Sequence, residues 1–174
     1  ISDAFVKALA RNVSSTERST TISEGQASVS TIEHLMSAFS GMGVDNAIVE
    51  IDNVEVPILD GSARYYVEAM LKEGLTEQDK DKRYVTIPRE IEVRDEATGS
   101  FIKVTPADEP SIDLTVDFGS RVLGIQRARW DESVDYASQI APCRTFVFFH
   151  EIEYLFQRNL VKGGDVDNAI VIVE

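Results

Sequence analysis

One pentapeptide occurs twice in the 174-residue chain, and this weak internal repeat bears on how many units the chain can form. The sequence Asp-Asn-Ala-Ile-Val stands at residues 45–49 and 167–171, each time after a valine and a glycine-containing loop. Such a repeat predicts two small units of similar plan, although five residues can also match by chance. Residues 76–83 are polar and charged without apolar periodicity, which is typical of a linker. We therefore expect one domain at residues 1–79 and another at residues 84–174.

The order of the expected elements predicts an α+β fold. The first unit contains two strands, a helix, a strand and a second helix, at residues 19–23, 27–30, 32–40, 47–51 and 63–73. The second unit contains four strands, a helix, a strand, a helix and a last strand, at residues 84–87, 91–94, 101–105, 112–118, 132–140, 144–149, 151–159 and 168–173. Mixed in this way, the elements favour two similar two-layer α/β sandwich units.

Composition and charge exclude several classes of protein. A net charge of -13 opposes binding to nucleic acid, because affinity for phosphates comes largely from Lys and Arg. No stretch approaches the ~20 apolar residues of a membrane span, and residues 1–10 do not resemble a secretory signal. We therefore expect a soluble, cytoplasmic protein. Cys143 is the single cysteine, so a metal site would have to use histidines and carboxylates.

Residues 30–35, Ser-Thr-Ile-Glu-His-Leu, contain the most informative pair of side chains. The apolar stripe of the expected helix is centred near Ile32, and His34 lies about 200° away from it around the helix axis. Small or polar neighbours on that face predict open space above the imidazole. Two structural alternatives stay open: Ser30 and Glu33 have the spacing of a capping box, and an exposed histidine often has no function.

Five blocks in a fixed order resemble the family of UDP-3-O-acyl-N-acetylglucosamine deacetylases. These blocks are residues 30–38, 41–46, 56–63, 144–146 and 152–155. The resemblance implies a zinc-dependent enzyme with its active site in the cleft between the two sandwich units. It also implies the reaction, which is hydrolysis of the N-acetyl group of UDP-3-O-(3-hydroxyacyl)-N-acetylglucosamine, the committed step of lipid A synthesis.

The resemblance further implies roles for individual residues. His34 would be a zinc ligand, Glu33 the general base, and Thr145 the residue that faces the scissile carbonyl or its tetrahedral oxyanion. This chemistry is coherent, because zinc lowers the pKa of bound water to about 7 and a nearby carboxylate can take the proton. Substrate contacts are implied for Asp60, Phe118 and Phe146, and an apolar passage for the acyl chain for Ile152, Leu160, Ala169 and Val171. Ordinary turn, strand or core roles would also explain each of these residues.

The sequence departs from the family in its metal ligands. A catalytic zinc has three protein ligands plus water, and the family's second His and its Asp come from a His-Lys-x-x-Asp motif that these residues lack. The family's Gly-Leu-His-Thr-Gly segment is also missing. We do not expect His150 or Cys143 to replace these ligands. We therefore expect an internal fragment that binds zinc weakly or not at all and does not turn over.

Two other interpretations remain open. The chain could be a non-catalytic binding or structural domain that retains this fold. Its parent could also be a fusion of the deacetylase with a hydroxyacyl-carrier-protein dehydratase. The sequence makes no prediction of the oligomeric state.

Overall fold

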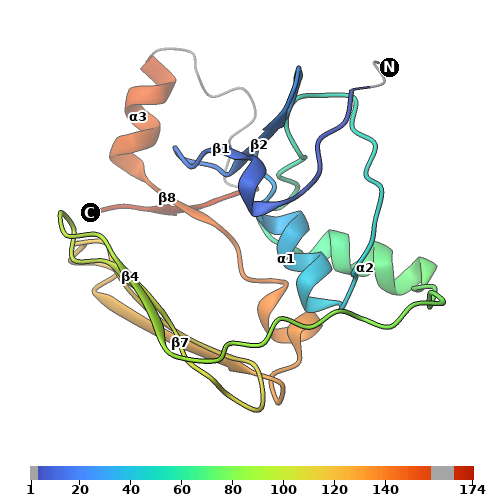
Figure 1. The fold of residues 1–174 in the computed structure, drawn as a ribbon. Helices are drawn as coiled ribbons and strands as arrows, with labels where there is room; N and C mark the ends of the chain where they lie inside the picture. The colour runs from blue at the N-terminus through green and yellow to red at the C-terminus, as the bar shows by residue number, and fades with distance from the viewer. Residues whose placement is uncertain (1–3, 158–166) are drawn as a thin grey trace. The chain divides into compact units, whose positions relative to one another are not determined.

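The computed structural model describes residues 4–157 and 167–174 (Figure 1). The chain forms two compact units. Unit 1 comprises Ile1–Thr76, Ser120–Val122 and Asp135–Glu174, and unit 2 comprises Glu77–Gly119 and Leu123–Val134. Residues 135–174 thus group with the first 76 residues, so the division into domains at residues 1–79 and 84–174 stays a prediction.

A small antiparallel sheet opens unit 1. After the 3-10 turn η1 (Ala10–Asn12) come β1 (Val13–Ser15), β2 (Thr21–Glu24) and β3 (Ala27–Val29), in the order β1-β2-β3. Gly25, between β2 and β3, has φ 62°, a conformation that glycine adopts without steric cost. The predicted hairpin is therefore confirmed, with its turn at the predicted glycine.

Two helices follow, α1 (Glu33–Gly41) and α2 (Arg64–Glu73), and they lie side by side in unit 1 (Figure 1). The fully buried side chains at their contact are alanines and a valine, and the larger, partly buried Met42, Tyr66 and Met70 pack around them. Ala38, Ala63, Val67 and Ala141 form the buried cluster. Small residues let two backbones approach closely, which explains how two short helices bury a core with little apolar volume.

The remaining part of unit 1 is a π-helical turn, a parallel strand pair and a helix. These elements are η2 (Tyr136–Ile140), β8 (Phe146–Phe148), α3 (Phe149–Gln157) and β9 (Ile170–Ile172). β8 and β9 run parallel, with Phe146 opposite Ile170. The predicted helix at 132–140 begins only at residue 136, because the Asp135 carboxylate caps it by accepting the Ser138 N–H at 3.0 Å.

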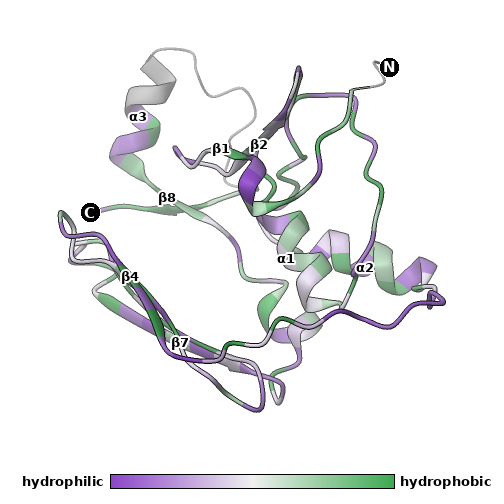
Figure 2. Ribbon diagram, viewed as in Figure 1, coloured by the Kyte–Doolittle hydropathy of each residue, from purple (hydrophilic) through white to green (hydrophobic). Residues whose placement is uncertain are grey.

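Unit 2 contains two antiparallel hairpins, β4 (Ile91–Arg94) with β5 (Phe101–Val104) and β6 (Ser111–Asp117) with β7 (Ile125–Asp131). Figure 2 shows hydrophilic and hydrophobic residues in both hairpins. In the first hairpin Lys103 bridges Glu90 at 3.1 Å and Glu92 at 3.4 Å. Strand β7 was not predicted, because arginines interrupt the apolar alternation of its sequence.

Two predicted strands are wrong. Residues 47–51 form no strand, and Ile48 is 95% exposed. Residues 84–87 also form none, and Tyr84 is 83% exposed. Apolar and β-branched residues favour a strand only where a neighbouring strand pairs with them, and these segments have none within residues 4–157 and 167–174.

The mixture of helices and small, mostly antiparallel sheets confirms the α+β class. The arrangement as two similar two-layer sandwich units stays a prediction. None of the helices described for this chain is long and apolar enough to cross a lipid bilayer.

Candidate active site

Glu33 and His34 are the first two residues of α1. The Glu33 side chain is exposed, and its Oε1 accepts a hydrogen bond from the backbone N–H of Thr20. The capping box, one of the two structural alternatives, does not form: the Ser30 hydroxyl instead donates to the Val54 carbonyl at 3.3 Å. A carboxylate in the first turn interacts favourably with the helix dipole, and here it also ties α1 to the segment before β2.

His34 is half-buried, and the prediction of an open face around it is wrong. Ala38, one turn further along, is fully buried, and the Ser37 hydroxyl lies 2.7 Å from the hydroxyl of Tyr136. A Cβ added at Gly41 would lie well under 3.0 Å from the Tyr136 ring. The small residues of this face therefore do not leave empty space. They allow η2 to pack against the helix.

Thr145 lies immediately before β8 and is half-buried. Its N–H donates to the Gly61 carbonyl at 2.7 Å, and its carbonyl accepts the Ile170 N–H at 2.9 Å. Its main chain is thus bound on one side by the turn before α2 and on the other by β9.

Residues 136–145 connect the two parts of the candidate site. At the start of this segment, Tyr136 contacts α1 through Ser37. In its middle, the Ala141 carbonyl accepts the Ala63 N–H at 3.0 Å, and Ala141 is part of the buried cluster with Ala38. The helix that carries Glu33 and His34 and the segment that ends at Thr145 therefore share the core of unit 1.

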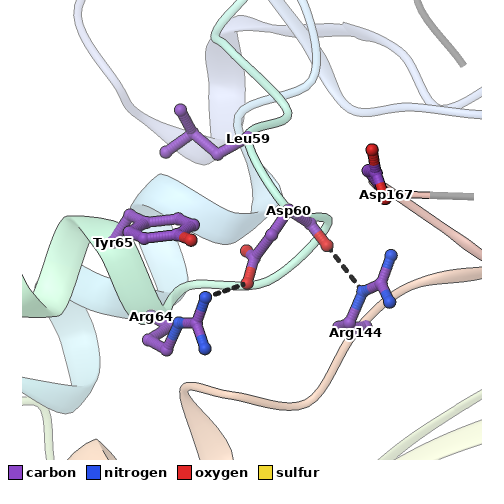
Figure 3. A pocket seen from close by; sticks show the side chains of 6 residues that line it. All are labelled: Leu59, Asp60, Arg64, Tyr65, Arg144 and Asp167. Carbon is purple, nitrogen blue, oxygen red and sulfur yellow. Dashed lines mark hydrogen bonds and ion pairs between the residues drawn. The ribbon is translucent and has the colours of Figure 1, made fainter. Parts of the chain in front are cut away.

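A pocket of about 520 Å³ opens beside this segment (Figure 3). It is lined by Leu59, Asp60, Arg64, Tyr65, Arg144 and Asp167. The Asp60 carboxylate pairs with Arg64 at 3.1 Å, while the Asp60 carbonyl accepts the Arg144 Nε–H at 2.7 Å. Asp60 is the only predicted site residue in this lining, which does not include Glu33, His34 or Thr145.

The other predicted substrate contacts are spread over both units. Phe146 is half-buried in β8, with its ring edge-to-face to Phe148 at 5.6 Å, whereas Phe118 is exposed directly after β6 in unit 2. The three described residues of the predicted acyl passage, Ile152, Ala169 and Val171, are half-buried in unit 1. Leu160, the fourth, lies outside the described residues. The substrate roles of all of them stay predictions.

The described residues do not form a complete metal site. Among them, no group of three or more His, Cys, Asp or Glu side chains is placed to hold a metal ion. His150 is exposed and stacks on Phe148 at 5.5 Å. A catalytic zinc needs three protein ligands, so His34 alone does not fit that requirement.

Arg144 and Tyr136 were not identified as site residues from the sequence. Arg144 directly precedes Thr145, and its bond to Asp60 joins two of the blocks that carry the family resemblance. No motif in the sequence points to Tyr136, because only the fold places its ring against Gly41.

Known proteins similar to this chain place it in a family. Residues 1–174 match the family model described as LpxC: UDP-3-O-acyl N-acetylglycosamine deacetylase. The chain is 45% identical to the bifunctional enzyme LpxC/FabZ of Porphyromonas gingivalis, over 97% of this chain and 37% of that protein. It is 40% identical to the UDP-3-O-acyl-N-acetylglucosamine deacetylases of Helicobacter hepaticus (95% of this chain, 55% of that protein) and of Nitratiruptor sp. (98% and 57%). It thus spans about half the length of these deacetylases and less of the bifunctional enzyme. The chain belongs to the UDP-3-O-acyl N-acetylglycosamine deacetylase family.

Proposed function

We propose that the protein containing this chain is a zinc-dependent deacetylase. It hydrolyses the N-acetyl group of UDP-3-O-(3-hydroxyacyl)-N-acetylglucosamine in the cytoplasm, as a step of lipid A synthesis. Acetate leaves and a free amine remains. The observation that carries the proposal is that Glu33 and His34 on α1 and Thr145 before β8 share one packed unit in a chain of this family.

Glu33 is the general base in this proposal. Its Oε1 accepts the Thr20 N–H, which fixes the direction of the carboxylate, and we assign proton transfer to Oε2. The side chain is exposed at the start of α1, so a water molecule and a substrate can reach it. A positioned carboxylate that takes a proton in the transition state contributes about 10²–10⁴-fold to the rate.

Thr145 stabilises the charge that develops on the acetyl oxygen. Both of its main-chain groups are hydrogen-bonded, so the position of its hydroxyl is set by the backbone. A donor held in advance at the place where negative charge develops is worth about 10²–10³ in kcat.

Zinc, when bound, supplies Lewis-acid activation of water and of the acetyl carbonyl. In this chain His34 would hold the metal, and by itself it does not supply the three protein ligands of a catalytic zinc. We therefore expect the 174 residues alone to bind zinc weakly or not at all. Equilibrium dialysis against zinc, together with a deacetylation assay of the chain by itself, tests this: turnover near that of the full-length protein would refute it.

Two groups of residues are proposed to contact different parts of the substrate. Asp60, Phe118 and Phe146 are proposed to contact the sugar and the nucleotide. Ile152, Leu160, Ala169 and Val171 are proposed to line the acyl passage, where each buried methylene of the chain contributes ~0.8 kcal/mol.

The test of this function uses the isosteric variant Glu33→Gln in the full-length protein. We expect zinc content to stay unchanged while kcat falls by at least ~10²-fold, because the amide cannot take the proton. Glu73→Gln, an exposed carboxylate near the end of α2, is the matched control and should keep full activity. Wild-type protein that binds zinc but releases no acetate would instead identify a non-catalytic domain.

The parent protein has a second candidate activity. Two relatives that are 45% and 43% identical to this chain are named as bifunctional LpxC/FabZ enzymes. We therefore propose a fusion to a hydroxyacyl-carrier-protein dehydratase as an alternative organisation. An assay of the full-length protein for dehydration of a 3-hydroxyacyl carrier protein distinguishes a fusion from a single-function deacetylase. Absence of dehydratase activity would contradict the fusion.

A further inference from the structure

The turn at residues 60–63 is bonded directly to the segment that carries Thr145. Two successive residues of that segment donate to two successive carbonyls of the turn: Arg144 Nε to Asp60 at 2.7 Å and Thr145 N to Gly61 at 2.7 Å. Figure 3 shows Arg144 reaching across to the Asp60 carbonyl from the neighbouring segment. One of these bonds is main chain and survives substitution, whereas the other depends on the arginine.

The turn itself is held tightly by its own side chains. The Asp60 carboxylate accepts the Ser62 hydroxyl at 2.7 Å and the Ser62 N–H at 3.2 Å, and it pairs with Arg64. Ser62 is fully buried, and its hydroxyl oxygen accepts the Arg64 N–H at 3.1 Å. Because the turn has these internal bonds, its carbonyls are fixed acceptors rather than parts of a loose loop.

The Thr145 side chain also contacts the turn. A Cβ added at Gly61 would lie 3.2 Å from the Thr145 methyl carbon and 2.9 Å from the Asn168 carbonyl carbon. Gly61 has φ 79°, so both the conformation and the space require glycine. With its methyl against Gly61, Thr145 is restricted at χ1, and because its Cβ is chiral, the hydroxyl then has one staggered position available. The distance between the turn and Thr145 therefore determines where the hydroxyl points.

We infer that Arg144 is a positioning residue for the deacetylation, which fixes the turn at residues 60–62 against Thr145 and so sets the direction of the Thr145 hydroxyl. The inference rests on the proposed function, in which that hydroxyl stabilises the transition state. Arg144 itself touches neither the reacting atoms nor the substrate in this role. Asp60 takes part through its backbone carbonyl and through its carboxylate, which holds the turn together.

The expected kinetic effect is on kcat. A catalytic group displaced by about 1 Å can lose ~10²-fold in rate, while ground-state binding through other residues is kept. In the full-length protein, Arg144→Ala should lower kcat by roughly 10- to 100-fold with KM changed by less than about 3-fold. Arg144→Lys retains an N–H donor and should recover part of kcat, whereas Arg144→Met should not. Arg11→Ala, an exposed arginine of unit 1, is the control and should behave as wild type.

The decisive experiment is a double-mutant cycle with Thr145→Val, which keeps a methyl group for Gly61 and removes the hydroxyl. If Arg144 acts through that hydroxyl, Arg144→Ala should cost little further kcat in the Thr145→Val background. Multiplicative losses, or wild-type kcat for Arg144→Ala, would overturn the inference. If Arg144→Ala does not fold, the cycle is run with the Lys and Met variants.

The cycle also separates this inference from the function on which it rests. A full-length wild type without deacetylase activity overturns the proposed function and the inference with it. Thr145→Val with unchanged kcat removes the proposed role of Thr145 and leaves the deacetylase assignment standing. If Thr145→Val lowers kcat and Arg144→Ala lowers it by the same further factor in both backgrounds, only the positioning role of Arg144 is contradicted.

Discussion

The substitution Gly41→Ala, at the end of α1, should have two opposite effects on the free energy of unfolding, one from helix propensity and one from packing. In an exposed helix interior the change from glycine to alanine stabilises by up to ~1 kcal/mol, because alanine loses less backbone entropy. Here the new methyl group would lie well under 3.0 Å from three carbon atoms of the Tyr136 ring. Real Cβ atoms do not approach so closely, so either the ring or the helix has to move.

The packing cost should exceed the gain. Overfilling a packed contact costs about 1–3 kcal/mol. Moving the Tyr136 ring also threatens its hydroxyl contact with Ser37 at 2.7 Å, and a hydrogen bond contributes ~1 kcal/mol. Subtracting the propensity gain of ~1 kcal/mol leaves a net destabilisation of about 1–3 kcal/mol.

Urea unfolding of the single and double variants measures this balance. In a Tyr136→Ala background the obstacle is gone, so the same Gly41→Ala change should reverse sign and stabilise by up to ~1 kcal/mol. Ser40→Ala, on the exposed side of α1, is the matched control and should gain up to ~0.5 kcal/mol in either background. Gly41→Ala that stabilises the protein while Tyr136 is intact would refute the close packing of η2 on α1.

Two further predictions concern unit 1. Val67 is 2% exposed, so Val67→Ala should lower the free energy of unfolding by about 2–3 kcal/mol, whereas Leu71→Ala, at 61% exposed, should change it by less than ~1 kcal/mol. Hydrogen bonds from the Ser138 hydroxyl and N–H lower the pKa of the Asp135 carboxyl below its ordinary value. Because the folded-state pKa is lowered, the stabilisation is present above the unfolded pKa and is lost as pH falls through the folded pKa. NMR titration should show the lowered pKa of Asp135, and Ser138→Ala should raise it by removing the hydroxyl bond while the N–H bond stays; an unchanged pKa would contradict the bond from the Ser138 hydroxyl.

Local sequence patterns predicted most of the elements that are complete by themselves. The hairpin around Gly25, helices α1 and α2 and the strand at 91–94 follow from periodicity and turn residues close in sequence. The strand predicted at 47–51 was wrong because a strand, unlike a helix or a hairpin, depends on a pairing partner that can lie far away in sequence. Local sequence patterns do not specify that partner.

The candidate site shows the same limit. The position of Glu33 and His34 at the start of a helix was predictable from the apolar stripe. The environment of His34 was not, because small residues such as Ala38 predict an open face and a close packing contact equally well until the partner is known. The partner here is Tyr136, about a hundred residues later in the chain. Long-range contacts of this kind leave no trace in helical or strand periodicity.

The order in which unit 1 is assembled has a consequence for folding during synthesis. Its buried cluster joins Ala38 and Ala63 to Ala141, so the first helices emerge from the ribosome well before the residue that completes their packing. Translation proceeds at about 5–20 residues per second, so α1 and α2 wait for seconds with apolar surface uncovered. Closing so long a loop also slows the search for the native contact. The nascent chain is therefore exposed to chaperones and to aggregation for as long as residues 74–141 are being made.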